Sequence, residues 1–204
     1  ACGETGPGRM IEPEEIVARL EAFFAPKWFS GHAVLVTAGP TYEPLDPVRV
    51  LTNLSSGKMG YALAQAFAQA GAAVTLVSGP VSLPTPLGVT RVDVTTAEQM
   101  RAAVLERVPG HRIFASVAAV ADYRPARVSP QKIKKGAERL TLELVRNPDI
   151  LAEVAALPEP PWCIGFAAES ENLDEYAERK RREKGLQLVV GNLVQEAMGR
   201  DENT

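Results

Sequence analysis

The sequence predicts a single α/β domain in which a Rossmann-like, doubly wound, mostly parallel sheet lies between two layers of helices, a three-layer architecture. From residue 33 onward, short apolar runs rich in valine alternate with helical patterns. This alternation favours parallel strands joined by right-handed crossovers. The 204 residues are enough for one domain that buries about 70% of its unfolded surface.

The predicted elements follow one another along the chain. A helix is predicted at residues 12–24, where Pro13 and acidic residues suit the first helical turn. Strands are predicted at residues 33–37, 73–78, 91–94, 113–118, 163–166 and 186–191. Further helices are predicted at residues 58–70, 97–107, 149–156 and 173–184. Residues 40–49 contain three prolines, which argue against a regular element.

One segment interrupts the alternation. Residues 123–136 are polar and basic and contain two prolines, and residues 140–145 beyond them resemble a strand. The segment is too long for a simple turn, so we predict a functional flap. Lys132, Lys134 and Lys135 would bring positive charge to a polyphosphate, or they form a solvated surface run.

Residues 53–60 (Asn-Leu-Ser-Ser-Gly-Lys-Met-Gly) have the composition of an anion site. Ser55, Ser56 and Gly57 open a helix, where backbone N–H groups suit a phosphate or carboxylate. An ordinary serine N-cap is the alternative. The stretch is neither a P-loop nor the Gly-x-Gly-x-x-Gly dinucleotide fingerprint.

Other candidates lie at predicted strand ends and on one helix face. Asp122 follows a strand, where it could accept hydrogen bonds from ribose, hold Mg²⁺, or cap the loop. Asp149 could simply favour a helix N-terminus, and Phe166 could stack on a base or lie in the core. Lys180 and Lys184 share a helix face that binds phosphate or faces solvent.

Composition excludes several classes of protein. The net charge is −3, which gives no support for nucleic acid or an anionic membrane as a partner. No apolar run approaches the ~20 residues of a membrane span. Two cysteines and two histidines cannot make a zinc site of the usual ligand count. We therefore expect a cytoplasmic protein.

Taken together, several motifs resemble the phosphopantothenoylcysteine synthetases, the CTP-dependent ligases of coenzyme A synthesis. The resemblance runs from residue 33 to about residue 203. It is carried by residues 37–41, 43–49, 53–60, 74–80, 118–123, 132–135, 147–150 and 165–169.

The resemblance implies a two-step reaction with Mg²⁺. The carboxylate of 4′-phosphopantothenate attacks the α-phosphate of CTP and releases pyrophosphate, and L-cysteine then displaces CMP from the acyl-cytidylate. By motif, Asn53 and Lys132 are the implied catalytic residues. The implied nucleotide contacts are Ser116, Val117, Ala118, Asp122, Lys132, Pro148, Asp149, Ile150, Leu151, Phe166, Lys180 and Lys184. The implied substrate contacts are Gly39, Asn53, Ser55, Ser56, Gly57 and Lys58, and the metal ligands stay open.

The N-terminus carries a second resemblance. Residues 1–10 are similar to the closing clamp of the flavin-dependent decarboxylase that bacteria commonly fuse upstream, and Cys2 matches its catalytic cysteine. We therefore expect residues 1–30 to be the tail of that domain and a linker helix, with FMN bound only by the upstream domain. Residues 31–204 are expected to form the synthetase domain, C-terminally truncated, in a homodimer that assembles further when fused.

Two alternatives remain at this stage. A nicotinamide-dependent short-chain reductase shares the fold and a Ser-Ser-Gly stretch, but its glycine fingerprint is missing. A regulatory or assembly subunit would keep the fold without turnover, which the presence of Asn53, Asp122 and Lys132 argues against.

Overall fold

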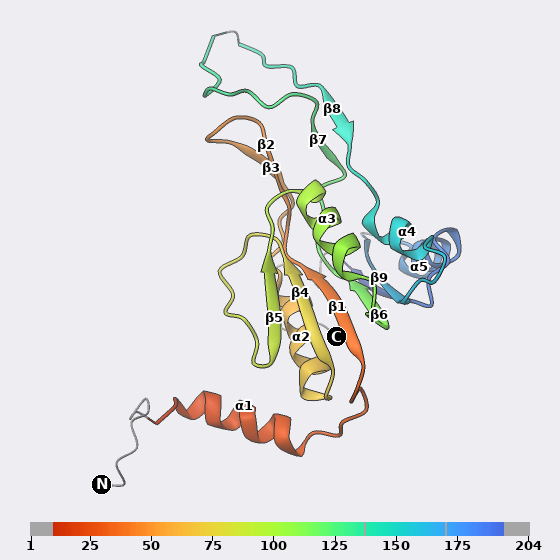
Figure 1. Cartoon of the computed structure of the whole chain (residues 1–204). Coiled ribbons are helices and arrows are strands. Elements are labelled where there is room, and N and C mark those ends of the chain that lie inside the picture. The colour runs from red at the N-terminus through yellow and green to blue at the C-terminus, as the bar shows by residue number, and fades with distance from the viewer. Residues whose placement is uncertain (1–9, 137, 170, 194–204) are drawn as a thin grey trace.

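The structure is a computed structural model that describes residues 10–136, 138–169 and 171–193. Its centre is a six-stranded sheet in which all neighbouring strands are parallel (Figure 1). The strand order is β10 (Leu188–Leu193), β9 (Trp162–Glu169), β6 (Ile113–Ser116), β1 (Ala33–Ala38), β4 (Ala73–Ser78) and β5 (Val89–Asp93). Within the sheet, the chain runs from β1 outward through β4 to β5, and then crosses back to β6 on the other side of β1. The predicted doubly wound sheet is confirmed, with its switch point between β1 and β6.

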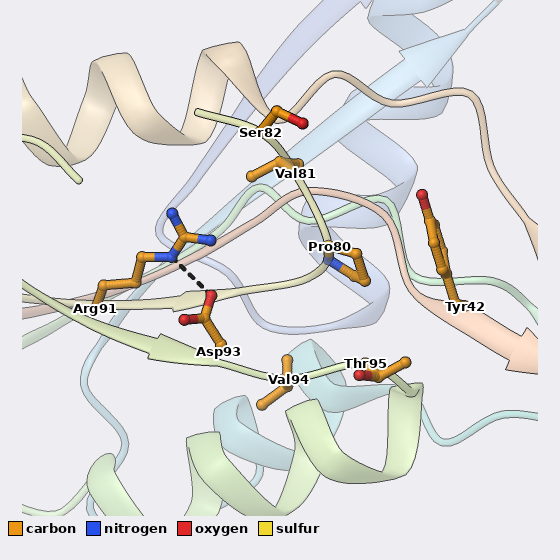
Figure 2. A pocket seen from close by; sticks show the side chains of 8 residues that line it. All are labelled: Tyr42, Pro80, Val81, Ser82, Arg91, Asp93, Val94 and Thr95. Carbon is orange, nitrogen blue, oxygen red and sulfur yellow. Dashed lines mark hydrogen bonds and ion pairs between the residues drawn. The ribbon is translucent and has the colours of Figure 1, made fainter. Parts of the chain in front are cut away.

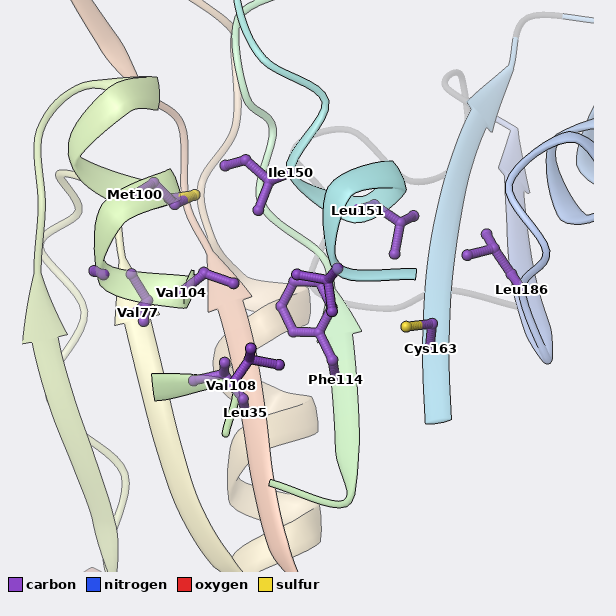
Figure 3. Packing of buried hydrophobic residues seen from close by; sticks show 12 residues of the cluster. Leu35, Val77, Met100, Val104, Val108, Phe114, Ile150, Leu151, Cys163 and Leu186 are labelled. Carbon is purple, nitrogen blue, oxygen red and sulfur yellow. The ribbon is translucent and has the colours of Figure 1, made fainter. Parts of the chain in front are cut away.

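Helices cover both faces of the sheet, which confirms the three-layer prediction. On one face, Tyr61, Ala64 and Phe67 of α2 (Lys58–Gln69) form a core with Val34 and Val36. On the other face, α3 (Ala97–Arg107) and α4 (Ile150–Ala155) pack over a second core around a fully buried phenylalanine (Figure 3). That core contains Leu35, Val77, Met100, Val104, Val108, Phe114, Ile150, Leu151, Cys163 and Leu186.

The last helix, α5 (Leu173–Glu183), covers the same face as α4. A Cβ atom on Gly165 would meet Leu151 of α4, so this side of β9 faces α4. Val189 lies opposite Gly165, and Gly191 is two residues further along β10. Because side chains alternate along a strand, Gly191 shares that face, where a Cβ would meet Leu173 of α5.

Two antiparallel ribbons extend beyond the carboxyl ends of the sheet, and α1 (Pro13–Phe24) lies at the opposite end (Figure 1). One ribbon pairs β2 (Tyr42–Pro44) with β3 (Val50–Thr52), and the other pairs β7 (Tyr123–Pro125) with β8 (Leu144–Arg146). The prediction that prolines exclude regular structure from residues 40–49 was therefore wrong. Pro44 is the last residue of a short strand with a single partner, where a missing N–H is tolerated.

Four strands differ in length from the prediction: β1 and β5 are each one residue longer, and β6 and β9 differ more. β10 keeps its predicted length but begins two residues later. β6 ends at Ser116 rather than at residue 118, because the next two amides donate to the Thr37 hydroxyl instead of continuing the ladder. β9 is longer than predicted and runs to Glu169, because β10 pairs with it over the added residues. Helix α3 has the predicted bounds. Thr96 begins it with a complete capping box, in which Gln99 completes the reciprocal bond.

Candidate ligand site at the ends of the strands

The loops that follow β1 and β6 are joined to one another at the switch point. Thr37 accepts hydrogen bonds from the amides of Val117 and Ala118, each at 3.2 Å. Thr41 accepts one from the Ala121 amide at 3.0 Å, and the amide of Ala119 donates to Gly39 at 2.9 Å. These bonds hold the predicted nucleotide segment after β6 against the predicted substrate segment after β1.

Asn53 lies at this junction. Its side-chain amide donates to the carbonyls of Ala119 and Val120, at 3.2 Å each. The residue itself is exposed, so its carboxamide lies between the loop after β6 and solvent. The structure therefore brings Asn53 against Ala119 and Val120, which directly follow the predicted nucleotide residues Ser116, Val117 and Ala118.

Glycines allow three loops to meet at the same end of the sheet. A Cβ on Gly39 or Gly57 would lie 3.0 or 2.9 Å from Val81, which follows β4. A Cβ on Gly79 would lie 1.8 Å from the carbonyl oxygen of Pro40. We call Gly39, Gly57 and Gly79 the glycine junction. It brings the start of α2 against the ends of β1 and β4.

The start of α2 tests the serine N-cap, one of the two interpretations of residues 53–60. The N-cap is Gly57, with a left-handed φ of 76°, and it makes no side-chain cap bond. The hydroxyl of Ser55 instead accepts from Gly57 at 3.3 Å, and that of Ser56 from Lys58 at 3.4 Å. The serine N-cap alternative was wrong, because both serines precede the capping residue and only tighten the turn into α2.

Asp122 is brought next to the segment before α4. Its carbonyl accepts from the Asn147 amide at 2.8 Å, and the Asn147 side chain donates to Ala121 at 2.7 Å. Arg124 donates to the Asn147 side chain at 2.9 Å and fixes its orientation. Asp122 itself is exposed.

Asp149 is the N-cap of α4. Its carboxylate accepts from Ala152 at 3.0 Å and pairs with Lys184 at 2.6 Å. Burial alone would raise the pKa of Asp149, but these bonds and the charges of Lys184 and Lys180 lower it below its usual value. Ile150 and Leu151 are core residues, each 5% exposed, so a ligand there would meet their backbone groups.

Lys180 of α5 and Lys184, the C-cap residue of that helix, turn toward the sheet and α4. Lys180 donates through its ammonium to the carbonyl of Phe166 on β9, and Lys184 reaches Asp149. Both side chains are half-buried, so the alternative of a purely solvated helix face was wrong. Phe166 is half-buried too, which leaves part of its ring accessible.

Lys132 lies outside this group. It is exposed on the flap, which extends from β7 and β8 beyond the sheet (Figure 1). Within the described residues, no hydrogen bond or ion pair joins Lys132 to the loops after β1 and β6. Cys2, the other outlying candidate, is not among the described residues.

A separate cavity of about 380 Å³ opens beside the glycine junction (Figure 2). It is lined by Tyr42, Pro80, Val81, Ser82, Arg91, Asp93, Val94 and Thr95, none of them a predicted site residue. Arg91 is already held by Asp93 at 2.7 Å, by the Leu83 carbonyl and by the face of Tyr61. The cavity therefore offers its arginine to a ligand only at the expense of these contacts.

Sequence reasoning missed the residues that position the site. Thr37 and Thr41 act through hydroxyls that accept from the loop after β6, and Asn147 acts through its amide. Thr37 was the one visible signal, a polar residue inside an apolar strand. The Asp-Pro-Val-Arg run at residues 46–49 is a turn signal, but its partner on the flap could not be foreseen.

These features define an α/β domain with a ligand site at the switch point of a doubly wound sheet. Comparison with known proteins identifies the family. Residues 29–204 match the model of the DNA/pantothenate metabolism flavoprotein C-terminal domain, and the chain belongs to this family.

Relatives agree with this assignment. The chain is 57% identical over 197 residues to the coenzyme A biosynthesis bifunctional protein CoaBC of Vibrio cholerae, covering 95% of this chain and 49% of that protein. It is 56% identical over 199 residues to CoaBC of Escherichia coli K12, with the same coverage. The chain thus spans about half the length of these curated relatives.

Solved structures give the same fold. The crystal structure of the C-terminal domain of a CoaBC protein matches with a TM-score of 0.73 and 44% identity, over 81% of this chain and 79% of that one. The Cab2 mutant H337A in complex with phosphopantothenate-cysteine matches with a TM-score of 0.70 at 21% identity, over 89% and 80%, which bears on the fold alone. The resemblance to the synthetase half of the bifunctional protein is confirmed.

Proposed function

We propose that this chain joins 4′-phosphopantothenate and L-cysteine in coenzyme A synthesis, with CTP consumed to CMP and pyrophosphate. One observation carries the proposal: Asn53, at the end of the substrate loop, bonds directly to the loop that follows β6. The two predicted binding segments therefore meet at one residue that can polarise a carbonyl without titrating. The similarity to CoaBC proteins favours this ligase over the reductase alternative.

In the first step, the substrate carboxylate attacks the α-phosphorus of CTP, and the bond to pyrophosphate breaks. The carboxylate is itself the nucleophile, so the protein has to position the reactants and offset charge. Lys132, Lys180 and Lys184 supply the positive charge. When the nucleotide binds, Lys184 would leave its ion pair with the Asp149 carboxylate and pair with a phosphate oxygen.

In the second step, the amine of L-cysteine attacks the acyl carbon, and the bond to the CMP oxygen breaks. Negative charge then develops on the acyl oxygen, where a neutral donor stabilises it. Asn53 is the donor that we assign to this oxygen, and its NH₂ group would exchange one of its two carbonyl bonds for it. Ser55, Ser56 and Gly57 at the start of α2 would hold the phosphate of the pantothenate substrate.

Magnesium would enter with the triphosphate. Mg²⁺ is usually held by one or two carboxylates together with substrate phosphates. The described residues contain no group of three or more His, Cys, Asp or Glu side chains arranged to hold a metal ion. Asp122, exposed at the strand ends, fits the role of a single carboxylate contact to the ion or to ribose.

A homodimer is the assembly that the ribbons support. Large apolar side chains are uncovered on the ribbons and in the loop that follows β3, among them Val48 at 63%, Leu54 at 87% and Leu140 at 59% exposure. Apolar side chains gathered on one exposed region are typical of an interface. No described helix has the length and apolarity needed to cross a membrane. A cytoplasmic dimer and the division of the chain near residue 30 remain parts of the proposal.

The test is pyrophosphate release from CTP and Mg²⁺, with and without 4′-phosphopantothenate, in the absence of cysteine. We expect release only with 4′-phosphopantothenate present, together with an acyl-cytidylate detected by mass spectrometry. Release that is independent of that substrate, or binding of NADP in place of CTP, contradicts the proposal. A protein that binds CTP without releasing pyrophosphate would instead favour the assembly-subunit alternative.

A further inference from the structure

Asp46 is a fully buried carboxylate in the loop between β2 and β3. Its side chain has no exposed surface, which is unusual for an aspartate unless the charge is paired. One carboxylate oxygen accepts from the amides of Val48 at 2.8 Å and Arg49 at 2.9 Å. The other accepts from the Arg49 guanidinium at 2.9 Å and from the amide of Ile133 at 3.1 Å.

Ile133 is held on both sides of its backbone. Its N–H donates to Asp46, and its carbonyl accepts from the Arg49 guanidinium at 2.8 Å. We call these contacts the Asp46 clamp. A second bond joins the same two segments, because the Ser129 amide donates to Leu45 at 3.0 Å. The clamp therefore fixes one residue of an otherwise irregular flap against a buried charge.

The clamped residue is the immediate neighbour of Lys132. The N–H and the C=O of Ile133 are both hydrogen-bonded, so the backbone of the adjacent Lys132 has little freedom to move. The Lys132 side chain itself stays exposed. We propose that Asp46 is a positioning residue that, through Ile133, holds Lys132 at the distance and direction that the transferring phosphoryl group requires. The clamp stands on its own contacts, whereas the role of Lys132 rests on the proposed function.

The variant Asp46→Asn tests the clamp without changing the size of the side chain. An asparagine removes the charge and replaces one acceptor oxygen by an NH₂ donor. In one orientation this donor faces the N–H of Ile133 and the Arg49 guanidinium, and in the other it faces the amides of Val48 and Arg49, so either orientation weakens the clamp. Hydrogen exchange of the amides of residues 131–135 should then be at least about tenfold faster, since hydrogen bonds to charged groups are the stronger ones. Glu106→Gln is the control, because it breaks an exposed pair with Arg107 far from the flap.

A kinetic cycle separates positioning from a general structural effect. Pyrophosphate release is measured over a range of CTP concentrations up to saturation for the wild type, Asp46→Asn, Lys132→Gln and the double variant. We expect Asp46→Asn to lower kcat about ten- to a hundredfold, as a small misplacement does, with KM for CTP within about threefold. If Asp46 acts through Lys132, the double variant should be no slower than Lys132→Gln alone.

Several outcomes would overturn the inference. Losses that multiply in the double variant, or unchanged exchange at residue 133 in Asp46→Asn, would each do so. If Asp46→Asn does not fold, Ile133→Pro removes the same hydrogen bond from the flap side, with Ile133→Val as its control. A wild-type chain that releases no pyrophosphate would refute the proposed function, while the exchange data would still decide whether the clamp exists.

Discussion

At the residue scale, the neutral amide of Asn53 is the feature most directly open to test. Its side chain donates to two backbone carbonyls and lies at the solvent edge of the site. Asn53→Asp replaces the donor by a carboxylate, which repels both those carbonyls and a developing oxyanion. We expect the first step to continue and acyl-cytidylate to accumulate, with product formation reduced on the order of a hundredfold.

Mass spectrometry of the reaction mixture measures that intermediate directly. Normal product formation by Asn53→Asp would remove the residue from the second step. A loss of pyrophosphate release instead would assign Asn53 to binding or to the first step.

Lys132 should matter in the opposite half of the reaction. Lys132→Gln shortens the side chain by one bond, keeps it polar, and removes the charge that would face the transferring phosphoryl group. We expect pyrophosphate release to fall by about two orders of magnitude with little change in CTP affinity. Arg139→Gln, which removes another exposed charge from the same segment, should leave the rate within about twofold. Equal losses of rate in both variants would mean that Lys132 contributes only a general electrostatic attraction for the nucleotide.

The Asp46 clamp also makes a prediction about pH. The Arg49 guanidinium, ahead of the backbone amides, holds the pKa of Asp46 well below its ordinary value of 3.8, although burial opposes this. A depressed folded-state pKa stabilises the fold above the unfolded value and loses this effect as pH falls toward the folded value. The stability difference between wild type and Asp46→Asn should therefore be constant above about pH 5 and shrink below pH 4. Urea titrations across this range measure it, and a difference that already shrinks between pH 7 and 5 would contradict the assignment.

At the element scale, the packing of α2 on β1 depends on the absence of one side chain. A Cβ on Gly60 would lie 2.5 Å from the Cβ of Ala38. Gly60→Ala should therefore destabilise the protein by about 1–3 kcal/mol, despite the better helix propensity of alanine. Gly136→Ala is the matched control, because open space surrounds that glycine. Denaturant midpoints compare the two variants, and a stable Gly60→Ala would mean that α2 can shift away from β1 freely.

Elements with a strong local sequence pattern were predictable. Elements whose bounds depend on pairing with a distant segment were not. The apolar runs of β1 and β4 and the capping box of α3 reveal these elements locally. Strand β6 ends early because of a hydroxyl on a neighbouring strand, and β2 exists because residues 50–52 lie beside it. Residues 123–125 and 144–146 pair across the whole length of the flap, which no local pattern shows.

At the scale of the whole molecule, the same distinction applies to the site. Motifs predicted that Asn53, Asp122 and the α5 lysines belong to one region, and the structure brings these residues to one end of the sheet. The sequence could not reveal that Ile133, the neighbour of Lys132, bonds to Asp46, because the two lie far apart in the chain. The roles of these residues stay predictions until they are measured.

The uncovered ribbons predict the assembly state. Val48, 63% exposed in the loop between β2 and β3, would be buried by a second copy of the chain. Val48→Asp should shift sedimentation from twice the chain's mass toward the monomer, because a buried unpaired charge opposes association. Leu87→Asp, a comparably apolar surface position near α1, should leave the mass unchanged. A monomeric wild type would leave the ribbons without the partner that we propose.

The glycine junction has a consequence for anyone who screens variants of this chain. Any side chain at Gly39, Gly57 or Gly79 collides with Val81, Gly79 or Pro40 before a ligand is involved. A growth-selection library would therefore show these three positions as intolerant, with a profile that resembles that of a reacting group. Intolerance at Asn53 would have another cause, since that residue is exposed and its replacement removes the two bonds to the Ala119 and Val120 carbonyls. Purified variants that stay folded but are inactive would indicate a residue with a chemical role. Variants lost from the soluble fraction would instead indicate close backbone packing at the glycine junction.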